Sequence, residues 1–421
     1  MIDHSLQLQG PGIGDVRGGS AAPRGSDVMN IASVCSLFPS RAHPEHGVFV
    51  ARRLAAVSRL ANVRVLHAIP WFPFVRPYSL DRQSDPGFCR DMRVSDQRLF
   101  YLPKVFKSWD GAWLKRSVLP TLRRWKSEFG IQCIDAHFGF PEGYGCVEAG
   151  KELGLPVFVT LRGVEQELVE DRAIRPKMIA ALKSAAGCIA VSENLRECVV
   201  SCGVPAERVR VIPNAVDPEM FRPGDRASAR AALNVAMGTP LIVSVGNFKP
   251  VKQQHLLVEA FAHIKRQFRD ARLVLIGGTE LDPAFTARVR ERISQLQVDD
   301  SVDFAGEKRP AEVAQWLQAA DVFAMASRRE GCCNAVLEAL ACRIPVVATD
   351  VGDNARFINA SCGCVVRPGD STALAEGLAT VLSDRREVDW TVRGMSRTWD
   401  DVAQESINYF TECMTARARR S

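Results

Sequence analysis

The sequence has no long run of apolar residues, although 47% of its 421 residues are hydrophobic. No stretch approaches the roughly 18 uninterrupted apolar residues that a membrane-spanning helix needs, and no basic start followed by an apolar segment marks a secretory signal. The net charge of +6 is small, which argues against a dedicated nucleic-acid binder and leaves room for a local basic patch. We therefore expect a cytoplasmic protein without a nucleic-acid partner, and the length suggests two or three domains.

The sequence also lacks cysteines at the spacing that a metal site needs. The 13 cysteines are scattered, and the close pairs Cys332/Cys333 and Cys362/Cys364 have no partners at the spacing of a zinc site. We interpret them as reduced thiols of a cytosolic protein. The sequence predicts neither a metal site nor a cofactor.

The most informative stretch that is present runs from residue 327 to residue 349. A short apolar strand (321–326) leads into a polar turn, and Asn334 is a natural N-cap for a helix over 335–342. Pro345 then admits a new buried strand. This strand–turn–helix–strand order is the half-unit of a doubly wound sheet, whose ligands lie at the carboxyl ends of the strands and against helix N-termini.

Two carboxylates bracket that turn, with Glu330 on the loop and Glu338 one turn into the helix. Carboxylates accept hydrogen bonds from sugar hydroxyls, so the pair suits a nucleotide sugar, with one glutamate for the hexose and one for the ribose. Two glutamates eight residues apart are also typical of a solvated loop and helix face. On spacing alone, both interpretations remain open.

Two further strand–helix junctions are candidates for ligand contact. In the first, the strand 29–36 is followed by a polar loop and a helix that begins after Gly47, whose amide is either a phosphate contact or simply a helix start. In the second, the strand that begins at residue 241 ends at Gly246, and Lys252 precedes the helix 255–268. Gly246 allows close backbone approach and Lys252 adds a cation to the helix N-terminus, so together they can hold a diphosphate.

These segments resemble the GT-B glycosyltransferases of family 4, and the resemblance covers nearly the whole chain from Met29 onward. The motifs that carry it are Gly47, His137, Arg162-Gly163, Pro213-Asn214, Gly246 to Lys252, and Glu330-Gly331-x-x-Asn334-x-x-x-Glu338. Five residues depart from the family pattern, namely Ala215 for Gly, Asn247 for the commoner Arg, Gln253 for Gly, Arg343 for Gly and Arg356 for Glu. If the helix before Arg343 ends in a left-handed residue, arginine there costs on the order of 1 kcal/mol. Within the family, the chain looks closest to exopolysaccharide and teichuronic-acid-type enzymes.

The resemblance implies an α/β fold of two facing Rossmann-like domains, with a C-terminal helix that crosses back to the first. We expect a disordered leader (1–27), an acceptor domain (28–215), a nucleotide-sugar donor domain (216–389) and the returning helix (390–421).

The implied activity is retaining transfer of a hexosyl group from a nucleoside diphosphate sugar to a saccharide acceptor, which we expect to be a lipid-linked glycan of the cell surface. In catalytic roles the resemblance places Lys252 at the leaving diphosphate, Glu330 at the hexose hydroxyls and His137 beside the reacting sugar. The expected donor-binding residues are Gly47, Gly246, Asn247, Lys249, Gly277, Gly306, Gly331, Asn334 and Glu338. Arg162 and Glu165 either have a role at the site, where they shape the acceptor side or hold a catalytic loop, or form an internal ion pair.

Two other functions are open. The departures at Asn247, Gln253 and Arg356 motivate a catalytically idle GT-B homologue that serves as an assembly partner in a polysaccharide complex. The retained Lys252 and Glu330 favour an enzyme. A nucleotide-sugar epimerase of the same fold is disfavoured because its motifs differ.

The segment 104–126 is basic and also carries Trp109, Trp113 and Trp125. A basic helix with tryptophan is typical of an element that lies on the inner face of a membrane. It is equally typical of an ordinary charged helix whose tryptophans pack in the core. The chain shows no repeat of 20 to 50 residues.

Overall fold

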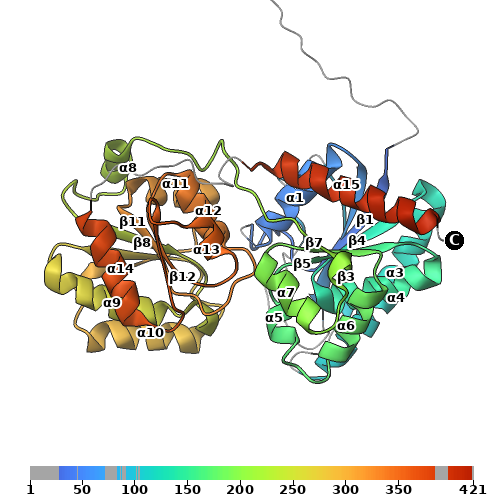
Figure 1. Ribbon diagram of the computed structural model, residues 1–421, viewed down its shortest axis with the longest axis horizontal. Helices are drawn as coiled ribbons and strands as arrows, with labels where there is room; N and C mark the ends of the chain where they lie inside the picture. Colours follow the sequence, from blue (N-terminus) through green and yellow to red (C-terminus); the bar gives the residue numbers. More distant parts are fainter. Residues whose placement is uncertain are drawn as a thin grey trace, which may run out of the picture.

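The computed structural model describes residues 28–44, 46–71, 83–85, 87, 92–100, 102, 105–384 and 397–419. The expected leader (1–27) and the residues around the expected boundary at 389–390 lie outside these ranges. The described chain forms two α/β domains that lie side by side (Figure 1).

The first domain is built on a seven-stranded sheet in the order β3-β2-β1-β4-β5-β6-β7, in which every strand pair is parallel. Its strands are β1 (Asn30–Cys35), β2 (Asn62–Trp71), β3 (Arg93–Phe100), β4 (Cys133–His137), β5 (Val157–Leu161), β6 (Gly187–Ala190) and β7 (Val209–Val211). Its helices are α1 (Val48–Ser58), α3 (Asp110–Phe129), α4 (Tyr144–Leu153), α5 (Glu165–Leu168), α6 (Arg175–Ser184) and α7 (Glu193–Ser201). The central strands β1, β4 and β5 are buried along almost their whole length because helices cover both faces of the sheet.

The second domain repeats this design with a six-stranded parallel sheet in the order β10-β9-β8-β11-β12-β13. Its strands are β8 (Leu241–Val245), β9 (Arg272–Ile276), β10 (Val302–Gly306), β11 (Val322–Met325), β12 (Val346–Thr349) and β13 (Gly363–Val366). Its helices are α8 (Arg226–Ala232), α9 (Gln254–Gln267), α10 (Pro283–Gln295), α11 (Pro310–Ala319), α12 (Asn334–Ala341), α13 (Asn354–Phe357) and α14 (Ser371–Ser383). Two apolar cores flank this sheet as well.

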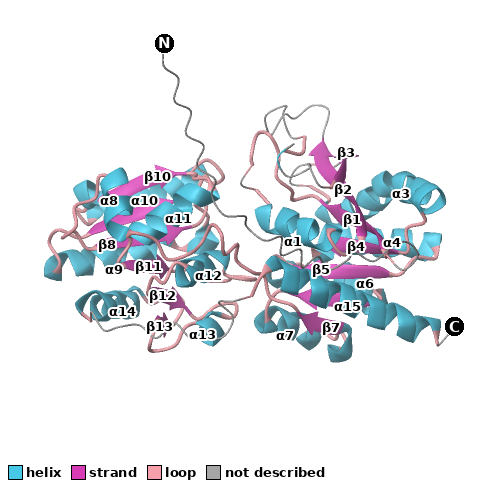
Figure 2. Ribbon diagram, turned by 90° about the horizontal axis from the view of Figure 1, so that it is seen from above, coloured by secondary structure: helices cyan, strands magenta, loops and turns pink. Residues whose placement is uncertain are grey.

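The C-terminal helix α15 (Trp399–Ala418) packs on the first domain, beside α1, as Figures 1 and 2 both show. The rings of Phe410 and Phe158 of β5 stack with their centroids 4.1 Å apart. Arg53 of α1 is buried and donates a hydrogen bond to Ser406 of the returning helix. The predicted architecture of two facing α/β domains with a returning helix is therefore confirmed.

Two elements differ from the sequence-based expectation. The sequence of residues 70–100 predicts a long irregular insert, yet its end forms β3, an edge strand that pairs with β2 from Arg64 to Trp71. Five of the eight residues of β3 are polar and only Leu99 is buried, so the strand lacks the apolar pattern that would reveal it.

The basic segment also divides into parts that differ in burial. Helix α3 begins only at Asp110, Trp125 is buried in the core of the first domain, and Trp113 packs against the same core. Trp109 and Phe106 precede the helix and are exposed. Neither interpretation of this segment therefore holds for all its aromatic residues.

Candidate active site

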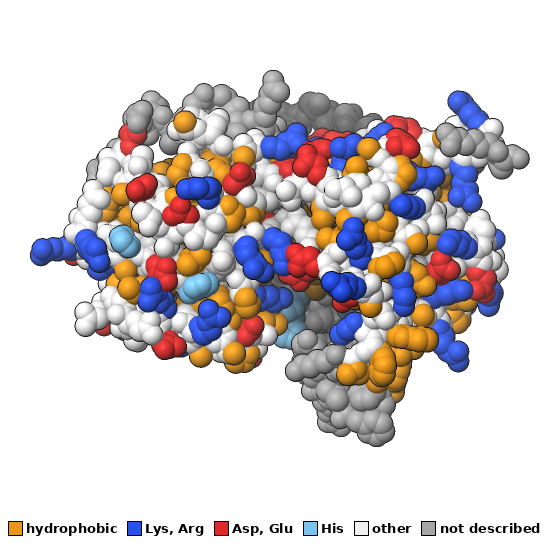
Figure 3. Space-filling model, turned by 60° about the horizontal axis from the view of Figure 1, so that its bottom comes forward, with side chains coloured by type: hydrophobic (Ala, Val, Ile, Leu, Met, Phe, Trp, Pro, Cys, Tyr) orange, Lys and Arg blue, Asp and Glu red, His pale blue; other side chains and the backbone are white. Residues whose placement is uncertain are grey.

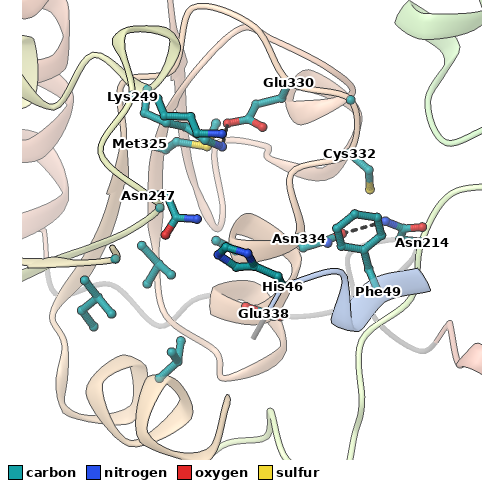
Figure 4. Close-up of a pocket in the computed structure, with 18 of the residues that line it drawn as sticks. His46, Phe49, Asn214, Asn247, Lys249, Met325, Glu330, Cys332, Asn334 and Glu338 are labelled. Atoms are coloured by element: carbon teal, nitrogen blue, oxygen red, sulfur yellow. Dashed lines mark hydrogen bonds and ion pairs between the residues drawn. The ribbon is translucent and has the colours of Figure 1, made fainter. Parts of the chain in front are cut away.

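A cavity of about 410 Å³ lies between the two domains (Figure 4). Its wall includes Val245, Ile276 and Met325, which end β8, β9 and β11. Arg162 and Asn214 contribute from the first domain. The cavity thus occupies the edge of a parallel sheet where ligands of doubly wound folds lie.

The wall of this cavity carries more cationic than anionic groups. The four cations are Arg162, Lys249, Lys252 and Lys308, and the three carboxylates are Glu307, Glu330 and Glu338. An excess of cations beside helix N-termini favours a ligand with several negative charges, such as a diphosphate.

Lys252 and Glu330 face each other in this wall. The Lys252 Nζ lies 2.6 Å from Oε1 of Glu330, and the Ser327 hydroxyl donates to the same oxygen at 2.6 Å. Burial opposes the charge of Lys252, but the Glu330 carboxylate outweighs it, so the pKa of Lys252 is raised. The lysine therefore stays charged at neutral pH. The structure brings these two predicted residues together.

Glu338 lines the same cavity from the second turn of α12. Burial raises the pKa of Glu338 to about 7, and the charge of Arg52 on α1 opposes this rise. Glu338 is therefore poised to change protonation near neutral pH. It remains where a ribose contact was predicted, at the N-terminal part of the helix that follows Glu330.

The start of α12 differs by one residue from the prediction. Asn334 is the first helical residue and Cys333 is the N-cap, which makes no side-chain capping bond. The side-chain Oδ1 of Asn334 instead accepts a hydrogen bond at 2.9 Å from Nδ2 of Asn214, across the two domains. Asparagine is favoured as an N-cap by local geometry, but here a tertiary partner takes its side chain. Asn334 still lines the cavity.

Two predicted glycines lie where β8 and β9 end. At Gly277, whose φ is +151°, an added Cβ would meet the carbonyl oxygen of Gly246 at 2.2 Å. The Asn247 side chain accepts a hydrogen bond from the Gly278 amide and so joins the same two loops. Gly246, Asn247, Lys249 and Gly277 all line the cavity.

His137 does not line the cavity, because the side chain of Arg162 lies between His137 and the cavity. The His137 side chain is fully buried, and its Nδ1 accepts a hydrogen bond at 3.0 Å from the Arg162 guanidinium, which can only donate. The ring proton is therefore on Nε2, which faces the Ser33 hydroxyl at 3.1 Å. Burial lowers the pKa of His137 to about 4 although Asp135 opposes it, so the imidazole is neutral.

Arg162 is the group that reaches the cavity from this buried cluster. Its guanidinium donates to Oδ1 of Asn214 at 3.0 Å as well as to His137, and it lies over the Phe49 ring. Burial and the neighbouring Arg53 lower the pKa of Arg162 to about 9, which leaves it charged at neutral pH. His137 thus positions the charged guanidinium of Arg162 at the cavity, although His137 itself does not reach the cavity.

Glu165 is buried and holds backbone instead of pairing with the Arg162 side chain. Its carboxylate accepts hydrogen bonds from the amides of Gly139, Arg162 and Gly163 at 2.7, 3.1 and 2.8 Å. It therefore fixes the two loops that follow β4 and β5. An internal ion pair, which was one of the two interpretations, is not what these contacts form.

Gly47 and Gly306 lie outside the wall of the first cavity. Gly47 is the N-cap of α1 at a φ of 74°, and an added Cβ would meet the Leu37 backbone at 2.8 Å. It lines a second cavity of about 520 Å³, which shares His46 and Lys249 with the first. Gly306 accepts a hydrogen bond from the Gly277 amide.

Several wall residues were not predicted from the sequence. His46 and Phe49 lie beside the predicted Gly47, and Asn214 lies within a motif that had no assigned role. The polar loop before Gly47 was the available signal for the first two. Nothing in the sequence indicated Lys308, which is brought in by the loop after β10.

No group of three or more histidine, cysteine, aspartate or glutamate side chains is arranged to hold a metal ion among the described residues. Within the same ranges, no helix is both long enough and apolar enough to cross a membrane.

Two parallel-sheet domains that enclose such a cavity define the GT-B class of α/β proteins. The chain belongs to the group 1, family 4 glycosyltransferases of this class. Residues 225–394 match the family model described as glycosyl transferases group 1, and residues 82–220 match the one described as glycosyltransferase family 4.

Curated relatives match part of the chain. A D-inositol 3-phosphate glycosyltransferase of Nocardia farcinica is 32% identical over 202 residues, which is 46% of this chain and 44% of the relative. A second, from Jonesia denitrificans, is 31% identical over 50% of this chain and 53% of its own length. The chain thus spans about half the length of the curated relatives that it matches.

Solved structures share the fold over more of the chain. A sucrose-phosphate synthase from Thermosynechococcus elongatus superposes with a TM-score of 0.65 and 22% identity, over 93% of this chain and 98% of that chain. The Anabaena protein HepE in complex with UDP-glucose superposes with a TM-score of 0.66 and 17% identity, over 93% and 100%. At these identities the likeness establishes the fold alone.

Proposed function

We propose that the protein is a retaining glycosyltransferase that moves a hexosyl group from a nucleoside diphosphate sugar to a glycan acceptor, lipid-linked and destined for a cell-surface polysaccharide. The observation that carries this proposal is the Lys252–Glu330 pair in the interdomain cavity, which Glu338 in the second turn of α12 also lines. Cations for a diphosphate and carboxylates for sugar hydroxyls meet there in one space.

The chemistry follows from this charge distribution. Breaking the bond between the sugar and the diphosphate leaves negative charge on the leaving oxygen, and Lys252 and Lys249 lie in the wall to stabilise it. Glu330 is held by Lys252 and Ser327 and serves as a hydroxyl acceptor, not as a free nucleophile. We therefore propose attack on the face from which the diphosphate departs, with the leaving phosphate taking the acceptor proton. Neither a metal nor a cofactor is part of this proposal.

The second cavity is the proposed place of the acceptor. It lies against the first domain, and Phe38, Ile69 and Pro70 line it together with the shared residues His46 and Lys249. Sharing these residues brings an acceptor hydroxyl next to the donor cavity. The curated relatives are named for a phosphorylated inositol, so a small phosphorylated polyol is the competing acceptor class.

Peripheral contact with the inner face of a membrane is part of the same proposal. Five large apolar side chains of the first domain are exposed, namely Trp71, Phe100, Val105, Phe106 and Trp109, and we propose that they form one apolar patch. Trp71 and Phe100 are paired in register, and the cations of Arg98 and Lys177 lie over the rings of Trp71 and Trp109. Figure 3 shows hydrophobic side chains gathered at the lower edge of this domain. Aromatic residues beside cations suit an anionic lipid surface.

A thermal-shift screen with UDP-, GDP- and dTDP-sugars, followed by transfer assays with the sugars that bind, tests the proposal. A donor at a hundred times its dissociation constant should stabilise the protein by about 2.7 kcal/mol. Binding without hydrolysis or transfer would favour the catalytically idle homologue, the alternative that the departures at Asn247 and Arg356 motivate. Absence of binding by every member of the panel would remove the proposal.

A further inference from the structure

A histidine, an aspartate and a serine that the proposed chemistry does not use meet at the second cavity. His67 is on β2, and Asp96 is its direct neighbour in the sheet, on β3. Ser84 lies between these two strands in the sequence. Nδ1 of His67 is 3.0 Å from Oδ1 of Asp96 and 3.0 Å from the Ser84 hydroxyl oxygen. Because His67 also lines the second cavity, this cluster stands directly behind the wall of the proposed acceptor site.

The hydrogen bonds of the cluster determine which ring nitrogen of His67 carries the proton. Burial opposes the charge of Asp96, but hydrogen bonds from His67 and Ser84 outweigh it, so the pKa of Asp96 is lowered. The carboxylate is therefore ionised at neutral pH and can only accept hydrogen bonds. It accepts from the Ser84 amide at 3.0 Å and from the Ser84 hydroxyl at 2.5 Å. Since the Ser84 proton is directed to Asp96, Nδ1 of His67 is the remaining donor to this carboxylate.

The other ring nitrogen of His67, Nε2, is left for a ligand. In a neutral imidazole whose Nδ1 carries the proton, Nε2 has a lone pair and accepts. No hydrogen-bond partner of Nε2 lies among the described residues, and Nε2 does not belong to their fully buried unpartnered nitrogens. An accepting nitrogen is thus accessible at the cavity wall.

The ring of His67 is held in this orientation by its surroundings. The Phe38 ring packs beside it with the centroids 5.7 Å apart. Ser84 is fixed in turn, because it forms a β-bridge with Ser40, and the Asp85 amide donates to the Pro39 carbonyl oxygen at 2.9 Å. Asp96 is fixed by the strand pairing of β3 with β2. The accepting nitrogen is therefore presented by a preorganised wall.

The charge around the second cavity differs from that around the donor cavity. Lys249 is the one lysine or arginine among the described residues that line the second cavity, and it belongs to the wall shared with the donor cavity. At His67 the nearest charge on its own hydrogen-bond network is the carboxylate of Asp96. This part of the wall therefore suits an uncharged ligand group that donates a hydrogen bond.

We propose that His67 is a specificity-determining residue for the acceptor, whose Nε2 accepts a hydrogen bond from a hydroxyl of an uncharged saccharide unit and disfavours a phosphate at the same place. The inference rests on the proposed function for the position of the acceptor. A sugar hydroxyl donates to the lone pair of Nε2, whereas the phosphate oxygens are strong acceptors with negative charge and would face that lone pair. Asp96 and Ser84 are positioning residues, because they act through His67.

The first test measures the protonation of the ring and needs no substrate. In protein with ¹⁵N-labelled histidine, long-range proton–nitrogen spectra at about pH 8 should show a protonated Nδ1 and an unprotonated Nε2 for His67. The signals are assigned by their loss in His67→Gln. Asp96→Ala removes the partner of Nδ1 and should abolish this single tautomer. A protonated Nε2 in the unmodified protein would overturn the proposal.

The second test compares methyl hexosides with their 6-phosphates as acceptors in transfer assays. His67→Ala should raise the KM for the hexosides about tenfold, which is roughly the worth of one neutral hydrogen bond. The donor KM and the KM for the phosphates should stay within about twofold. His67→Gln keeps an accepting side-chain oxygen and should recover part of the affinity for the hexosides.

His263→Ala is the matched control, since it removes an exposed histidine of α9 on the second domain and should leave every KM within about twofold. An unchanged hexoside KM in His67→Ala contradicts the proposal, as do equal losses for hexosides and phosphates. If no acceptor is turned over, the proposed function fails by itself, and titration of methyl hexosides onto the labelled protein judges His67. A shift of its Nε2 signal supports the contact, and an unmoved signal overturns it.

Discussion

At the scale of single residues, the Lys252–Glu330 pair concentrates the proposed chemistry. We expect Lys252→Ala and Glu330→Ala each to reduce turnover at least a hundredfold, which corresponds to about 2.7 kcal/mol or more. The reason is loss of charge opposite the leaving diphosphate in the first variant and of a hexose contact in the second. Turnover by the purified variants, with circular dichroism to check folding, measures this effect. Rates near those of the unmodified protein would take both residues out of the site.

Glu338 gives a prediction about pH. Burial raises the pKa of Glu338 to about 7, well above the usual range of a glutamate, so it is mostly protonated below pH 7 and ionised above it. An ionised carboxylate accepts both ribose hydroxyls, so donor affinity should rise as the pH increases through 7.

Calorimetric titration of the donor between pH 6 and 8 measures this change. The glutamine of Glu338→Gln cannot ionise. Any change of donor affinity with pH that remains in this variant therefore comes from the phosphates of the donor and from other groups of the protein. The same slope in both proteins would contradict a role for the Glu338 charge.

His137 illustrates what residue patterns leave undecided. Its motif and its position at the end of β4 mark it as a site residue. No local signal reveals that Arg162, 25 positions later, lines the cavity in its place. That order depends on how β4 and β5 lie next to each other. A direct contact of His137 with the sugar remains a prediction.

At the scale of secondary-structure elements, two departures from glycine coincide with left-handed backbone. Gln253 precedes α9 at a φ of 49°, and Arg343 follows α12 at a φ of 59°. The left-handed end of the helix before Arg343, stated from the sequence as a condition, is confirmed. A residue with a Cβ pays a penalty in this region, which glycine avoids.

Arg343→Gly is therefore expected to stabilise the protein by about 1 kcal/mol. Chemical denaturation of the purified protein measures the difference. Arg343→Ala is the control, because alanine removes the side chain beyond Cβ yet keeps the strain. If alanine stabilises as much as glycine, the backbone conformation is not the cause.

The elements that sequence reasoning missed have polar surfaces. The buried strands and amphipathic helices around Lys252 and Glu330 can be predicted from the spacing of their apolar residues. Helices cover both faces of the second sheet, so these strands and helices carry apolar residues that show this spacing. The edge strand β3 has few apolar residues because solvent reaches it, and only pairing with β2 makes it a strand. This strand therefore depends on tertiary pairing and cannot be predicted from its own residues.

At the scale of the whole molecule, the apolar patch predicts membrane binding. We expect co-sedimentation with vesicles that contain anionic lipid, and weaker binding to neutral vesicles or at high salt. The double variant Phe106→Ser and Trp109→Ser should lose at least tenfold in binding, since it removes the two most exposed aromatic rings of the patch. Met237→Ser changes an equally exposed apolar residue on the second domain and serves as the control. Equal binding by both variants would contradict the patch as the contact surface.

The sequence by itself determined the two α/β domains and the placement of Lys252, Glu330 and Glu338 at strand and helix ends. Each of these positions depends on a strand, a turn and a helix that follow one another within about thirty residues, so local patterns suffice. The tertiary structure alone decided that Arg162 faces the cavity in front of His137, that Asn214 takes the side chain of Asn334, and that Asp353 meets α7. The contacts of Asn334 and Asp353 join residues 120 and 160 positions apart, and they exist because two separately folded sheets are brought face to face. The order of His137 and Arg162 instead depends on the neighbouring strands β4 and β5 of a single sheet.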